Sequence, residues 1–143
     1  MKEGQIISIP LDDGRFVCAR VLQFDMRGEN RDSRMCIIGL LNWIGNVEPS
    51  SESISGSKLI DHGQVHIKTI RESGGEIVGF RSLDLDEISV PLTLDQSPGK
   101  NCRLRRGFII LGNATEQQQT ELKVFRTWGY GMLKIKAEKC FSE

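Results

Sequence analysis

The chain has 143 residues, of which 38% are hydrophobic and 27% are charged, a composition typical of one soluble globular domain. Its 19 basic and 19 acidic side chains give zero formal net charge, which argues against a dedicated nucleic-acid binder and a polybasic membrane-surface protein. No apolar run approaches the roughly 18 residues that span a bilayer, and no secretory signal opens the chain. We therefore expect a single domain over residues 1–143, located in the cytoplasm.

The first 25 residues predict a β-hairpin. A β-branched segment over 5–10 ends at a proline, Asp-Asp-Gly at 12–14 supplies a turn, and a second strand follows over 15–24. Alternation places Cys18, Arg20 and Leu22 on one face of that strand and Val17 and Val21 on the other. Because both faces are largely apolar, we expect a central strand that is covered on both sides.

Five further segments predict strands, separated by polar or breaker-rich stretches. Residues 26–34 predict a loop, and the serine-rich residues 45–58 form the least ordered stretch by composition. The expected strands cover residues 34–41, 63–70, 76–81, 87–92 and 103–111.

Helices are expected late in the chain. Residues 115–122 consist of helix formers behind the candidate N-cap Thr115. Residues 132–141 fit either a helical stripe or a strand, and the stripe formed by Leu133, Ala137, Cys140 and Phe141 favours the helix. The sequence thus predicts a mainly β protein: a strongly bent antiparallel sheet or a small SH3-like barrel with one or two short C-terminal helices, with α+β as the alternative.

Residue chemistry predicts no enzyme, metal site or cofactor. The cysteines lack a Cys-x-x-Cys pair, and we expect Cys18 and Cys36 to be free thiols packed in the core. His62 and His66 would share a strand face, but a metal site would need a third ligand from elsewhere, so we interpret them as surface histidines. No nucleophile elbow or phosphate-binding loop is found.

The charge is unevenly distributed along the chain. Residues 72–96 carry one basic and six acidic side chains, whereas residues 97–143 carry nine basic and four acidic ones. In extended chain, Asp84 and Asp86 face the same way, with Glu87 opposite. This pattern indicates a solvated face or a surface that docks a basic partner, and an acid/base pair is the third alternative.

Arg103, Arg105 and Arg106 form the densest basic cluster. Such a cluster can contact nucleic acid, but this usually also requires aromatic side chains for stacking, and Phe108 is the nearby one. Pairing with the acidic residues of the chain is the alternative. Trp128 and Tyr130 alternate around a glycine and fit either the core or an interface anchor.

The N-terminal hairpin resembles a known family. Residues 2–22 read Lys-Glu-Gly-Gln-Ile-Ile-Ser-Ile-Pro-Leu-Asp-Asp-Gly-Arg-Phe-Val-Cys-Ala-Arg-Val-Leu. This order of glycine, apolar strand, Pro-Leu, Asp-Gly turn, aromatic and second strand resembles the immunity protein 26 family of bacterial polymorphic-toxin immunity proteins. Residues 125–129, Phe-Arg-Thr-Trp-Gly, are similar to an arginine-and-tryptophan stretch near the end of that family.

The resemblance implies a mainly β cytoplasmic protein that binds and neutralises a cognate toxin domain, often a nuclease. The expected partner is therefore the C-terminal domain of a toxin, as in contact-dependent inhibition, and the oligomeric state is left open. We expect Asp84, Asp86, Glu87, Trp128 and Tyr130 to bind this partner, on charge and aromatic grounds. A small β-barrel that binds nucleic acid through Arg103, Arg105 and Arg106 is the alternative function.

Overall fold

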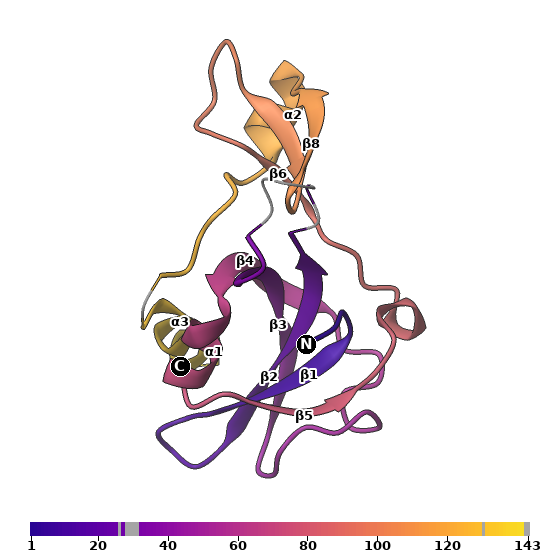
Figure 1. Cartoon of the computed structure of the whole chain (residues 1–143), viewed down its shortest axis with the longest axis vertical. Coiled ribbons are helices and arrows are strands. Elements are labelled where there is room, and N and C mark those ends of the chain that lie inside the picture. The colour runs from indigo at the N-terminus through magenta and orange to yellow at the C-terminus, as the bar shows by residue number, and fades with distance from the viewer. Residues whose placement is uncertain (26, 28–31, 130, 142–143) are drawn as a thin grey trace.

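The computed structural model describes residues 1–25, 27, 32–129 and 131–141. These residues form eight strands, three short α-helices and one turn of 3-10 helix, and the strands form two β-sheets (Figure 1). In chain order the elements are β1 (Gln5–Pro10), β2 (Phe16–Phe24), β3 (Met35–Gly45), β4 (Leu59–His66), α1 (Ile67–Glu72), β5 (Glu76–Phe80), η2 (Leu83–Asp86), β6 (Leu92–Leu94), β7 (Arg103–Arg106), β8 (Ile109–Asn113), α2 (Glu116–Glu121) and α3 (Met132–Cys140).

The main sheet has five antiparallel strands in the order β4-β3-β2-β1-β5, and a smaller antiparallel sheet has the order β6-β7-β8. The prediction of a mainly β fold with antiparallel sheet and short C-terminal helices is confirmed. Among the described strands, β4 and β5 remain separate edges, so the main sheet is open and the barrel alternative does not form.

The β1–β2 hairpin forms as the sequence predicts. Ile9 pairs with Val17 and Ile6 with Arg20, and the turn contains Gly14 at a φ of +90°, which glycine adopts without strain. β2 lies in the middle of the main sheet and is buried on both faces. This burial explains why its apolar residues do not alternate with polar ones.

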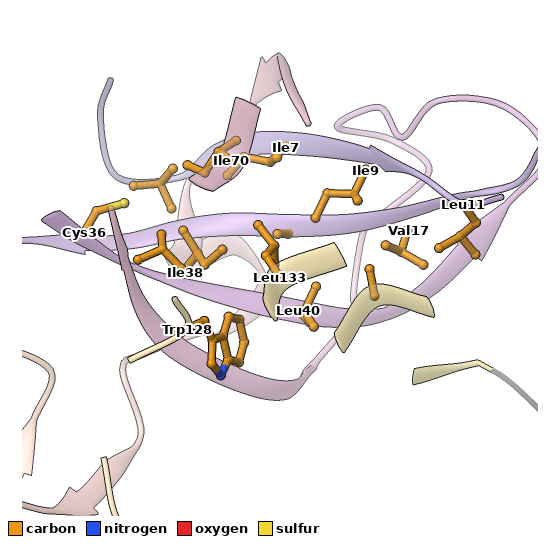
Figure 2. Packing of buried hydrophobic residues seen from close by; sticks show 14 residues of the cluster. Ile7, Ile9, Leu11, Val17, Cys36, Ile38, Leu40, Ile70, Trp128 and Leu133 are labelled. Atoms are coloured by element: carbon orange, nitrogen blue, oxygen red, sulfur yellow. The ribbon is translucent and has the colours of Figure 1, made fainter. Parts of the chain in front are cut away.

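One face of the main sheet is covered by α1, α3 and the indole of Trp128. Ile7, Ile38 and Leu40 of the sheet pack in the same cluster as Leu133, and all four are at most 1% exposed. Figure 2 shows the indole lying beside the strands together with these aliphatic side chains. The expected helix over 132–141 is confirmed, because α3 brings its apolar stripe onto this face.

The opposite face is covered by loops and η2 rather than by a long helix. Ile54, which lies in the serine-rich stretch, is fully buried against this face, together with Ile88 and Phe108. Ser50 and Ser53 exchange hydrogen bonds between their backbone N–H groups and hydroxyls at 2.8 and 3.1 Å. The stretch expected to be least ordered is therefore a hydrogen-bonded turn that contributes to the core.

Three strand predictions are wrong in part. The strand expected over 63–70 ends at His66, whose ring accepts the N–H of Lys68 and caps helix α1. The segment 87–92 buries Ile88 and Val90 without pairing, and the strand begins at Leu92. The single strand expected over 103–111 is a hairpin of β7 and β8.

Two other predictions concern the cap of helix α2 and the loop over 26–34. Helix α2 begins after Thr115 with a reciprocal capping box between Thr115 and Gln118, which confirms the expected cap. The loop predicted over 26–34 lies largely outside the described residues. Of the helices that the structure describes, none is long and apolar enough to cross a membrane.

Candidate functional site

The acidic residues at 84, 86 and 87 lie on and just after η2, not on extended chain as the sequence analysis assumed. Because a 3-10 helix has about three residues per turn, Asp84 and Asp86 point in different directions. Asp84 and Glu87 are exposed, whereas Asp86 is 2% exposed. The structure therefore separates the expected acidic group into two surface carboxylates and one buried carboxylate.

Asp86 binds Arg20, which is fully buried on the loop-covered face of β2. Nη1 of Arg20 lies 3.3 Å from Oδ2 of Asp86. The guanidinium also donates to the carbonyl of Gly4, at 3.4 Å from Nε and 3.3 Å from Nη2, and to the carbonyl of Arg81. With one carboxylate and two carbonyls as partners, this buried cation ties η2 to the middle of the main sheet.

Arg81 provides the second cation of this buried network. Its Nε lies 2.8 Å from Oδ2 of Asp86, and its other nitrogens donate to the Ser51 carbonyl at 3.3 Å and to the Ser55 hydroxyl at 3.1 Å. Oδ1 of Asp86 accepts the backbone N–H of Gly56 at 2.8 Å. The carboxylate thus joins the serine-rich turn, the end of β5 and η2 at one point.

The charge of Asp86 is maintained by these bonds. Burial alone would raise the pKa of its carboxyl. Hydrogen bonds from Arg81, from the Gly56 N–H and from Arg20 outweigh burial and lower the pKa from 3.8 to about 2. Asp86 is therefore ionised in the folded protein at neutral pH, and its oxygens are occupied within the chain.

The exposed side of η2 combines carboxylates with apolar side chains. Leu85 is 65% exposed and Phe80, at the end of β5, is 46% exposed. Glu3, Phe80 and Asp84 line a shallow depression of about 210 Å³ beside η2. We call this region the η2 surface and define it by Glu3, Phe80, Asp84, Leu85 and Glu87.

Two lysines lie against the η2 surface. Nζ of Lys2 lies 4.2 Å from the centre of the Phe80 ring, and Nζ of Lys58 lies 3.8 Å from Oε2 of Glu87. Lys58 and Glu87 are both well exposed, and exposed ion pairs of this kind are screened by salt and contribute little. The carboxylates of this surface therefore remain available to a partner's cations.

Of the two aromatic residues expected at an interface, the structure describes only Trp128. Trp128 is 2% exposed and its indole packs directly over the backbone of Gly63, so it is a core residue. Its indole N–H has no hydrogen-bond partner among the described residues. Tyr130 lies outside the described residues, and its expected role at an interface stays a prediction.

Two of the three arginines in the basic cluster have partners within the chain. Arg103 pairs with Asp95, with Nε 2.9 Å from Oδ2, as the alternative interpretation expected. The guanidinium of Arg105 lies 3.8 Å from the centre of the Phe125 ring and donates to the carbonyl of Gly107. Arg106 is exposed on β7. This arrangement leaves a smaller cationic surface than the sequence indicated.

The histidines and cysteines do not form a chemical site in the part of the chain that the structure describes. His66 caps α1 and His62 is half-buried, where burial lowers the pKa of its imidazole. In this part of the chain, no group of three His, Cys, Asp or Glu side chains is arranged to hold a metal ion. Cys18 and Cys36 are free and buried, as expected.

The protein is small and mainly β, and its candidate site is the exposed η2 surface. The chain matches the family model of Immunity protein 26 over residues 2–99, which is more than half of its length. This chain belongs to the immunity protein 26 family, and the family gives it an immunity function with a toxin as partner. No curated protein and no solved structure matches it. The family match ends before residues 125–129, so it does not test the second part of the resemblance.

Proposed function

We propose that this protein neutralises a toxin domain with a positively charged active-site cleft, such as a nuclease, by binding over that cleft through the η2 surface. The observation that supports this is the exposure of Asp84 and Glu87 on either side of Leu85, all on one turn of chain. Complementary charge accelerates encounter and selects the partner, whereas desolvated apolar side chains supply most of the affinity. The inhibition is non-enzymatic and acts in the cytoplasm of the cell that makes the immunity protein.

The residues of the site divide into contact and positioning residues. Asp84 and Glu87 contact the partner's cations, and Leu85 and Phe80 contact apolar parts of the partner. Asp86 has no free oxygen to offer, and it positions η2 through its bonds to the buried arginines. A rigid, preorganised surface loses less conformational entropy on binding than a flexible loop does.

Binding to the toxin domain encoded beside this gene tests the proposal. The variant combines Asp84→Lys with Glu87→Lys, and the control combines Glu72→Lys with Glu116→Lys, two exposed positions on α1 and α2. Both variants change the net charge equally. We expect the η2 variant to bind at least tenfold more weakly, with a lower association rate at low salt, and to lose protection of cells that express the toxin. Equal dissociation constants for the two variants would exclude this surface.

A further inference from the structure

A cleft of about 330 Å³ lies between the two sheets, and none of its lining residues belongs to η2 or to the η2 surface. Its walls are the first half of β4, the start of β6 and the chain segment 121–126, and Lys136 of α3 also lines it. The volume falls in the range of sites that bind ligands, about 300–1,000 Å³. Because the cleft lies at the junction of two sheets, its shape depends on the chain segment that connects them.

The extended segment 123–128 holds the sheets together and forms one wall of the cleft. Leu94 of β6 donates its N–H to the Lys123 carbonyl at 2.9 Å and accepts the Phe125 N–H at 2.7 Å. Gln64 of β4 donates to the Arg126 carbonyl at 2.9 Å and accepts the Trp128 N–H at 2.8 Å. The segment therefore pairs with β6 first and with β4 farther along, so it diverges from the first half of β4.

This divergence leaves part of an edge strand uncovered. β4 is one of the two edge strands of the main sheet, and among the described residues no strand pairs with its outer edge over 59–62. Alternation in an extended strand turns the backbone groups of His62 toward the same edge as those of Gln64. The His62 N–H donates to Oδ1 of Asp61 at 2.8 Å, and an added strand would replace this side-chain acceptor with a backbone carbonyl. Ile60 is 41% exposed there. An unpaired edge offers backbone hydrogen bonds to an added strand of about four residues.

The side chains around this edge are apolar below and cationic at the rim. Lys123 and Arg126 are exposed, and neither makes an ion pair with another described residue. Nζ of Lys136 lies 3.2 Å from Oδ2 of Asp61, so that carboxylate is neutralised within the chain. Glu121 is the other carboxylate of the lining. The rim therefore carries excess positive charge.

Thr93 adds an independent sign that the cleft accommodates a polar group. It lines the cleft and is 3% exposed, yet its hydroxyl has no hydrogen-bond partner among the described residues. Leaving a buried hydroxyl unpaired is unfavourable unless another molecule supplies the partner. Leu92 and Val124 of the same lining offer apolar contact. Among the described lining residues no Phe, Tyr or Trp is present and the imidazole of His62 is the one ring, which offers little surface for stacked bases.

We propose that this cleft binds an extended acidic peptide segment of a protein partner, which adds to the outer edge of β4 and places its carboxylates on Lys123 and Arg126. Apolar side chains of the same segment alternate with the carboxylates and pack against Leu92 and Val124. The proposal does not depend on the η2 surface or on the identity of the toxin.

Amide chemical shifts of the isotope-labelled full chain test this proposal with synthetic pentapeptides that alternate valine and aspartate. At about 1 mM peptide we expect shifts at Ile60, His62 and Val124. A lysine counterpart with the opposite charge should give none. A counterpart with the same aspartates and N-methylated backbone amides should bind at least tenfold more weakly, because strand addition requires its N–H groups.

Two variants locate the site. Lys123→Glu with Arg126→Glu should weaken binding of the aspartate peptide at least tenfold, whereas Lys100→Glu with Arg106→Glu, exposed cations elsewhere, should leave it unchanged. Unchanged shifts outside the cleft confirm that each variant folds. Equal binding of the N-methylated peptide, or the same shifts with succinate, would reduce the cleft to an anion site and overturn strand addition. Shifts with a single-stranded DNA oligonucleotide alone, or with no probe, would overturn the proposal.

Discussion

Substitution of Asp86 by asparagine removes the carboxylate that faces two arginines beneath η2. The side chain keeps nearly the same size, and its oxygen still accepts the Gly56 N–H. The change therefore acts on charge and leaves the packing of this face intact. Arg20, which is fully buried, would lose its carboxylate partner and keep its bonds to the carbonyls of Gly4 and Arg81.

The expected loss of stability is large for a single isosteric change. Removing one partner of a buried ion pair typically costs about 3–5 kcal/mol, because the other charge stays buried without compensation. Arg81 retains some contact with water and the carbonyl bonds of Arg20 persist, so we expect a value near the lower end, about 3 kcal/mol. For a chain of this size that corresponds to a fall in Tm of roughly 6–12 °C.

Urea unfolding followed by circular dichroism measures this change. Asp84→Asn is the matched control, because Asp84 is exposed on the same turn of helix, and surface substitutions usually stay within about 0.5 kcal/mol. Replacing Arg20 by methionine together with Asp86 by leucine should recover part of the loss, since apolar pairs often substitute for buried ion pairs. If Asp86→Asn and Asp84→Asn unfold at the same urea concentration, the network does not stabilise the loop layer.

Three further outcomes follow from the described contacts. Gly63→Ala should destabilise by about 1–3 kcal/mol in thermal unfolding, because a Cβ there would lie 2.6 Å from the indole of Trp128; an unchanged Tm would contradict this packing. Because the folded pKa of Asp86, about 2, lies below its ordinary value of 3.8, its contribution of about 2 kcal/mol is present above about pH 4 and is lost as the pH falls toward 2. Acid titrations of stability should therefore be shallower in Asp86→Asn, and identical slopes would refute the assignment. Burial raises the pKa of the Cys18 and Cys36 thiols to about 12, so both should react with a disulfide reagent only in proportion to the unfolded fraction in urea, and rapid reaction in native buffer would disprove their burial.

Local sequence signals predicted the N-terminal hairpin and the C-terminal helices well. The Asp-Gly turn and the two-faced apolar pattern of the second strand identify a central strand because burial on both sides removes the usual alternation. Thr115 and Gln118 form the expected capping box, since this signal depends on neighbouring residues alone. Elements defined by short-range chemistry are therefore those that the sequence predicts reliably.

The strand errors arise where local patterns fit two structures. Val65, Ile67 and Thr69 alternate as a strand does, yet the chain after His66 forms helix α1, which buries its own residues Thr69 and Ile70. In the segment 103–111, Gly107 has a φ of +62°, and the chain reverses there. Either structure satisfies the local pattern, and tertiary packing selects between them.

The negative charge of the candidate site could be predicted from the sequence, but its geometry could not. The acidic excess before residue 96 points correctly to Asp84 and Glu87 as exposed carboxylates. Asp86 has the same side chain, but it is buried because Arg20, 66 positions earlier in the chain, requires a partner on that face. The signal for this pair is a lone arginine within an apolar strand, and the sequence does not reveal which carboxylate it binds.

The two proposed surfaces draw on different parts of the chain, and this makes them separable. Every residue of the η2 surface and its buried network lies within residues 2–99, the range that matches the family. The cleft takes β4 from that range, but its rim cations Lys123 and Arg126 lie beyond it. Energetic effects of distant, independent sites add. If charge reversals at both surfaces weaken binding to one toxin additively, the toxin covers both; if the rim variants leave toxin affinity unchanged, the cleft serves a different partner.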